Sequence, residues 1–138
     1  MSTLLKTAGD AIRTRFDTLV GAVQKVDVHY DNSPVKHPAD GVKKWIRTVI
    51  LWDEQNQVDM GGDTRRWRQT GILLAQVRVP LGQGDSDARE LSDAVVTAFR
   101  GVSFSGITFR AAQPRQVGRV GNYWQINVNC PFYIDEVI

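Results

Sequence analysis

The feature that most restricts how this chain can fold is a regular alternation of apolar and polar side chains from Tyr123 to Ile134. Successive side chains of a β-strand point to opposite faces, so the run predicts one long strand with an apolar face and an amide-rich face. Strands of this kind are typical of antiparallel sheets that bury only one side. The apolar set is Trp124, Ile126, Val128, Cys130 and Phe132.

Other segments also carry strand patterns. Residues from Trp45 to Trp52 alternate, and both of their faces hold apolar side chains. Residues from Ile72 to Val79 form a second apolar run, and Pro80 cannot continue its hydrogen-bond ladder. Both runs predict strands that are at least partly buried. Shorter strands are predicted at Val26–Tyr30, Ile107–Ala111 and Gln116–Val120.

Two segments have helical periodicity instead. Apolar residues recur every three or four positions from Leu4 to Val23, and Gly21 is expected to end or loosen that helix. A second apolar stripe runs from Ala88 to Phe99 and is followed by Gly101, which suits the position after a helix. Three polar residues precede this stripe and are candidate N-caps, and Glu90 is placed for a capping box with Asp87. The N-cap candidates are Asp85, Ser86 and Asp87.

The order helix, strands, helix, strands predicts the fold class α+β, an antiparallel β-sheet with two main helices packed on one face. The chain of 138 residues is expected to form a single domain, 1–138, with one core. Its hydrophobic fraction of 42% and charged fraction of 23% are ordinary for a globular protein. No stretch reaches the roughly 18 apolar residues that a membrane span needs, and the start of the chain does not read as a signal peptide.

Residues that could carry chemistry are sparse. His29 and His37 are the only histidines and lie far apart in sequence, and Cys130, the only cysteine, is expected to be buried and inert. The acidic residues around Asp85 are explained by capping and by the helix dipole. Gly82-Gln83-Gly84 lacks the Lys-Ser/Thr ending of a phosphate loop. The sequence therefore predicts no catalytic residue, no metal site and no cofactor, and a protein that is not an enzyme.

One charged cluster requires an explanation. Arg65, Arg66 and Arg68 surround Trp67, and together with Asp63 they give this segment the same excess of +2 as the whole chain. Because glycines flank the cluster, we expect a loop that reaches outward, and Arg and Trp are typical of protein contact surfaces. A solvated hairpin tip and a single-stranded nucleic-acid site with Trp67 stacked on a base are the alternatives.

A second segment is also a candidate contact region. Residues 31–41 contain two prolines and several turn-forming residues, so they predict a long exposed loop. Its candidate contact residues are Lys36, His37 and Asp40.

The order of several short motifs resembles a known family. The motifs are Gly61-Gly62, Arg65-Arg66, Thr70-Gly71-Ile72-Leu73, Val77-Arg78-Val79-Pro80, Gly82-Gln83-Gly84, Ala88, Leu91 and Phe99-Arg100-Gly101. In this order they resemble the tail-terminator-like proteins of long-tailed phages, once catalogued as a bacteriophage-related domain of unknown function. The resemblance covers essentially the whole chain.

The resemblance implies a structural role in the virion. Proteins of this family form a ring, commonly hexameric, at the head-proximal end of the tail tube, where they stop tube polymerisation and present a docking surface to the head connector. The implied partners are further copies of the chain, the tail tube protein and the head–tail connector or neck protein, while DNA only passes through the lumen. Assembly is expected in the host cytoplasm, without a membrane. We expect Arg65, Arg66, Trp67 and Arg68 to contact a neighbouring subunit or the tail tube. Another neck or head-closure component, or a small nucleic-acid-binding module, remains the alternative.

Overall fold

The computed structural model describes residues 4–30, 43–57, 65–82 and 84–137. The chain begins with helix α1 (Leu4–Phe16), which continues through a π-helical turn η1 (Asp17–Gly21) into the short α2 (Ala22–Gln24). The helix therefore loosens into a wider turn that ends at Gly21, which is one of the two outcomes expected for this glycine. The helix itself ends three residues later, at Gln24. Its termination coincides with Lys25, whose φ of 53° is left-handed.

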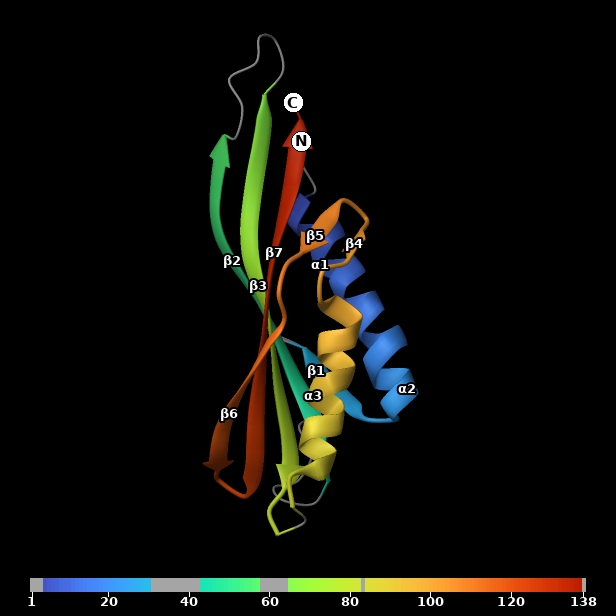
Figure 1. Ribbon diagram of the computed structural model, residues 1–138. Coiled ribbons are helices and arrows are strands. Elements are labelled where there is room, and N and C mark those ends of the chain that lie inside the picture. Colours follow the sequence, from blue (N-terminus) through green and yellow to red (C-terminus); the bar gives the residue numbers. More distant parts are fainter. Residues whose placement is uncertain (1–3, 31–42, 58–64, 83, 138) are drawn as a thin grey trace.

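A seven-stranded sheet forms the other layer (Figure 1). Its strands are β1 (Asp27–Tyr30), β2 (Trp45–Gln57), β3 (Arg66–Pro80), β4 (Ser103–Phe104), β5 (Ile107–Phe109), β6 (Gln113–Val120) and β7 (Tyr123–Val137). The order is β1-β2-β3-β7-β5-β4, and β6 also pairs with β7. Among the described strands, only β1 and β2 pair in parallel, and the other pairs are antiparallel. The predicted α+β class with a mainly antiparallel sheet is confirmed.

Helix α3 (Ser86–Phe99) follows β3 and lies beside α1 on the same side of the sheet (Figure 1). The core lies between this helical layer and alternate residues of β3 and β7, and phenylalanine rings connect the layers. The rings of Phe99 and Phe109 have centroids 5.0 Å apart, and those of Phe109 and Phe132 are 5.2 Å apart. The predicted apolar face of the last strand is confirmed, because Ile126, Val128, Cys130 and Phe132 are all buried. Burial also raises the pKa of the Cys130 thiol to about 12, so at neutral pH it is protonated.

Gly101 has a φ of 63° and follows α3 as predicted. The predicted capping box is wrong. The N-cap residue of α3 is Asp85 and not Asp87, and its side chain makes no capping hydrogen bond. Its carboxylate instead forms an ion pair with Arg89 Nη2 at 3.1 Å. The Asp85 side chain is thus used in an ion pair with a residue one helical turn away instead of capping the helix.

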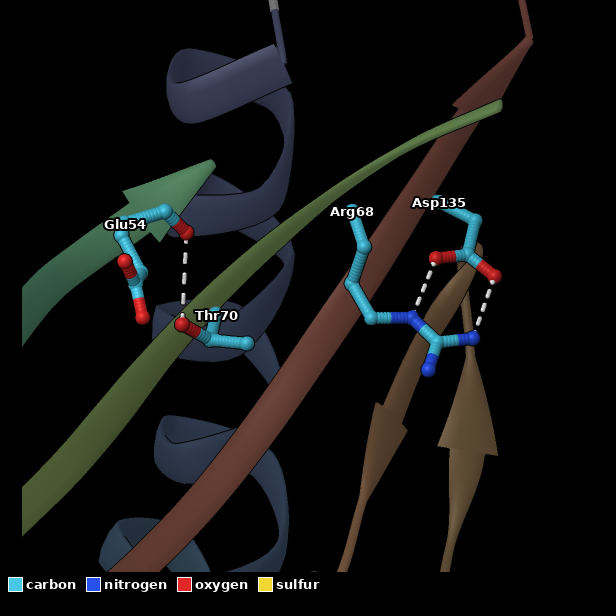
Figure 2. A network of polar contacts seen from close by, with 4 residues as sticks. All are labelled: Glu54, Arg68, Thr70 and Asp135. Carbon is cyan, nitrogen blue, oxygen red and sulfur yellow. Dashed lines mark hydrogen bonds and ion pairs between the residues drawn. The ribbon is translucent and has the colours of Figure 1, made fainter. Parts of the chain in front are cut away.

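Strands β2 and β3 extend well beyond the runs predicted from their apolar residues. A bulge between Trp52 and Gln55 lets β2 continue, after which Asn56 lies opposite Arg68. Two side chains of β3 bond to the bulged backbone: Gln69 Nε2 donates to the carbonyl of Asp53 at 3.0 Å, and Thr70 Oγ1 donates to that of Glu54 at 3.3 Å (Figure 2). Polar residues thus form strand here because β3 is central, with a ladder on each side.

Gly71 lies inside β3 and does not act as a hinge of the arginine segment. A Cβ atom at this position would lie 2.6 Å from Phe132 Cζ and 3.0 Å from the carbonyl oxygen of Leu51. The missing side chain lets Phe132 pack across the strand, where its ring also meets Trp52 edge-on at 5.6 Å. The glycine is therefore required by packing.

Candidate functional site

The arginine segment lies at one end of three long neighbouring strands, β2, β3 and β7. These strands extend past the helices at that end of the molecule, so their tips project from the body of the domain (Figure 1). Arg66 is opposite Val137, and Arg68 lies between Asn56 of β2 and Asp135 of β7. Arg65 directly precedes the strand and is exposed.

This placement corrects the expectation of a flexible loop for the cluster. Arg66, Trp67 and Arg68 are the first three residues of β3, and β7 pairs with all three. The prediction was wrong because it relied on apolar alternation, whereas the ladder to β7 holds these polar residues in extended conformation. The side chains therefore start from a rigid backbone.

Arg68 makes a two-pronged ion pair with Asp135. Its Nε donates to Oδ1 at 2.8 Å and its Nη2 donates to Oδ2 at 3.0 Å (Figure 2). The side chains are 30% and 26% exposed, so the pair is partly shielded from water. The hydrogen bonds from Arg68, with a further contribution from the charge of Arg66, hold the pKa of Asp135 below its ordinary value.

Tyr133 supports this pair from the same strand. The Arg68 guanidinium carbon lies 4.1 Å from the centroid of the Tyr133 ring, and that of Arg110 lies 5.1 Å from it. Cation–π contacts of this kind fix the planes of both guanidinium groups. We call the group Arg65, Arg66, Arg68, Arg110, Tyr133 and Asp135 the arginine end.

Sequence reasoning missed Arg110, Tyr133 and Asp135 as members of this site. The only available signal was that Tyr133 lies within the predicted strand from Tyr123 to Ile134, on the face opposite its apolar set. Asp135 lies 67 positions from Arg68, and no local pattern relates the two. Their pairing depends on the register between β3 and β7.

Trp67 does not lie with the arginines. Side chains alternate along a strand, so Trp67 points to the face opposite that of Arg66 and Arg68, and it is half-buried. An aromatic platform flanked by these arginines on one surface, which single-stranded nucleic acid would use, is not formed by Trp67.

The remaining candidate residues give no second site. Lys36, His37 and Asp40 lie outside the described residues. His29 is buried and meets the Trp45 ring edge-on at 4.9 Å. In the described ranges, no group of three or more His, Cys, Asp or Glu residues is arranged to hold a metal ion. None of the helices in those ranges is long and apolar enough to cross a membrane.

The arginine end can therefore act as a preorganised cationic contact. Arg68 and Arg110 are held over the Tyr133 ring, and Arg65 and Arg66 add positive charge at the projecting tip. Fixed guanidinium groups lose less side-chain entropy on binding than mobile ones, so such a tip favours a carboxylate-bearing partner surface.

No protein-family model and no curated protein matches the chain. Fifteen chains of solved structures do match. One of them, a protein named only by a sequence identifier, aligns with a TM-score of 0.62 at 18% sequence identity, over 91% of this chain and 94% of its own length. At that identity the likeness establishes a shared fold.

Proposed function

We propose that this protein is a tail-terminator-like virion component of a long-tailed phage. In this role it forms a ring at the head-proximal end of the tail tube, ends tube polymerisation and provides the docking surface for the head connector. The support is twofold: the order of motifs described above, and an architecture in which one end of a long sheet projects as a contact element.

The single observation that carries the proposal is the projecting arginine end. The Arg68–Asp135 pair, with bonds of 2.8 and 3.0 Å, joins two long strands at their tips and keeps the tip extended. A subunit that must seat on a preformed tube benefits from such a rigid contact, because little ordering is needed on binding. We assign this end to a neighbouring subunit or to the tail tube protein.

The other parts of the proposal follow from the same architecture. Two main helices on one face of the sheet leave its outer edges for contacts between copies, which suits a hexameric ring. DNA passes through the lumen only transiently, since tight phosphate binding would hinder its passage. The finished protein is located in the virion neck, after assembly in the host cytoplasm.

Electron microscopy of lysates from a phage lacking this gene tests the proposal. Filled heads beside unattached tails of irregular or excess length are expected, because the tube has lost its stop. Tails of normal length that do not join heads would transfer the role to a neck or head-closure component. Intact joined virions would contradict both roles.

A further inference from the structure

Two strands on opposite sides of the sheet offer backbone edges to a partner. On the outer side of β2, β1 pairs only as far as Thr48, and in the described part of the chain no strand continues along Val49–Asn56. On the other side of the sheet, β6 pairs with β7 alone, and nearly all of its residues are exposed. Exposed edges of this kind bind further strands by main-chain hydrogen bonds.

The two edges have the polarity needed to join one copy to the next. β2 is antiparallel to β3, β3 to β7, and β7 to β6, so β2 and β6 run in opposite directions. If a second copy continues the sheet in the same orientation, its β6 lies antiparallel to β2 of the first. The contact uses a different surface on each copy, so it is heterologous, the type that generates rings.

The charges of the two edges are complementary. The free part of β2 carries Asp53 and Glu54 and no basic residue, whereas β6 carries Arg115 and Arg119 and no acidic residue. Each edge therefore repels a second copy of itself and attracts the other. Charged edges usually protect a sheet from aggregation; opposite signs also permit one specific pairing.

The order of side chains along the strands agrees with antiparallel pairing. Leu51 is opposite Ile72, which is opposite Pro131, whereas Val120 is opposite Tyr123. Tyr123 lies eight residues before Pro131 on β7, an even number, so Leu51 and Val120 are on the same face of the sheet. Leu51 is 50% exposed and Val120 is 39% exposed. Along the chain direction of β2, Leu51 comes first and Asp53 and Glu54 follow. In that same spatial direction β6 is followed backwards, so Val120 comes first and Arg119 and Arg115 follow. When antiparallel strands place Leu51 opposite Val120, Arg119 and Arg115 come opposite Trp52 and Asn56, each within two residues of Glu54. A parallel pair with the same apolar contact would carry the acidic residues past the end of β6.

We propose that β2 of one copy, along Val49–Asn56, pairs with β6 of the next copy, so that the sheets of neighbouring subunits become continuous. The inference rests on the proposed ring function and assigns the surfaces that close the ring. β6 lies beside the start of β7, and the free part of β2 is level with its second half. Neighbouring copies are therefore displaced along the strands, and the strands are inclined to the ring axis, as in closed barrels.

Disulfide cross-linking of the full chain tests the pairing. Two single variants, Leu51→Cys and Val120→Cys, are mixed with one of them carrying a mobility tag, and then oxidised at low salt. The native Cys130 thiol is buried and stays in both. The expected result is that the mixed dimer, linked between positions 51 and 120, is more abundant than either homodimer. Val23→Cys, at an exposed position on the helical layer, replaces Leu51→Cys as the matched control. A mixed dimer no more abundant than with Val23→Cys would overturn the proposal.

Charge reversal provides the second test. Asp53→Arg/Glu54→Arg and Arg115→Glu/Arg119→Glu should each reduce the mixed dimer severalfold, and combining the two reversed edges should restore it. Asp87→Arg/Glu90→Arg gives the same change in net charge on α3 and should leave the yield unchanged. If cross-linking is unaffected by reversal while the gene deletion still yields overlong tails, the ring function stands and the strand pairing is wrong. If cross-linking behaves as expected but tails are normal, the pairing stands and the tail function is wrong.

Discussion

At the residue scale, the Arg68–Asp135 pair determines how the arginine end is built. The two residues lie 67 positions apart in sequence and join the tips of β3 and β7. The Arg68 guanidinium also lies over the ring of Tyr133. A partly shielded, two-pronged pair contributes more than a typical surface pair, for which about 0 to 1 kcal/mol is the usual range.

Replacing Asp135 should therefore lower stability more at neutral pH than in acid. Because the pKa of Asp135 in the folded protein is below its ordinary value of 3.8, the contribution of the pair is present above that pH. It is lost as the pH falls through the lowered value. Urea unfolding of Asp135→Asn should show a loss of about 1 kcal/mol at pH 7 that becomes smaller as the pH falls below 3.8. A loss of the same size throughout this pH range would show that the charge is irrelevant.

Gly71 allows a second residue-scale prediction. Gly71→Ala introduces a methyl group 2.6 Å from Phe132 Cζ, so the buried ring must shift, at a cost of about 1 to 3 kcal/mol. Gly9→Ala is the matched control, because its nearest atom would be Trp52 Cζ2 at 3.9 Å and alanine favours a helix. Thermal unfolding should show a lower Tm for the first variant and an equal or higher Tm for the second. Equal effects would contradict the packing role of Gly71.

At the scale of elements, the β2–β3 hairpin depends on its bulge. Gln69 is buried, and its amide donates both to the carbonyl of Asp53 and to that of Thr70, at 3.0 and 2.9 Å. The first bond holds the bulge of β2 against β3, and the second lies within β3. Beyond the bulge, the outer half of β2 reaches the arginine end and supplies the edge that we propose for subunit pairing.

Gln69→Ala should loosen the outer half of β2 while leaving the rest of the sheet intact. The lost hydrogen bonds cost about 1 kcal/mol, and amide exchange should accelerate at residues beyond the bulge more than in β7. Gln116→Ala, at an exposed glutamine of β6, is the control and should change neither quantity measurably. Uniform acceleration through the sheet would mean that Gln69 supports the whole fold and not this hairpin.

At the scale of the whole molecule, the projecting strand tips separate contact residues from structural ones. Arg68 is paired with Asp135, so replacing it would lower stability and also remove a contact residue. Arg65 precedes the strand and Arg66 begins it, and both add charge at the tip.

Arg65→Ala/Arg66→Ala should therefore leave circular dichroism unchanged and lower Tm only slightly, since the charge of Arg66 also acts on Asp135, while association with the tail tube or the neighbouring subunit weakens. Complementation of the gene deletion should give fewer joined virions. The loss of association relative to the wild-type chain should be largest at low salt and shrink as salt is raised, because screening weakens the interaction that these charges supply. Arg89→Ala/Arg100→Ala removes the same charge from α3 and its end and should complement fully. Full complementation by both variants would exclude the arginine end as a contact.

Much of the fold could be predicted from the sequence because buried residues recur at the regular spacing of a helix or a strand. The apolar faces of α3 and β7 repeat at helical or strand spacing, and most of their expected core residues are buried. In the first helix the expected stripe is only partly right, because Leu5, Leu19 and Val23 are exposed. The candidate site could be predicted only in part. Arg66 and Arg68 were selected for their chemistry, but their strand conformation and their partners were not visible, since neither depends on neighbouring residues in sequence.

What the sequence by itself determined is therefore the mixed α+β class and most of the core residues of α3 and β7, since both follow from local periodicity. The tertiary structure decided the extent of β2 and β3, the packing need for Gly71 and the joining of Arg68 to Asp135. Each of these depends on the register between strands distant in sequence. That register is set by the summed ladder and core contacts, and no single segment contains the information.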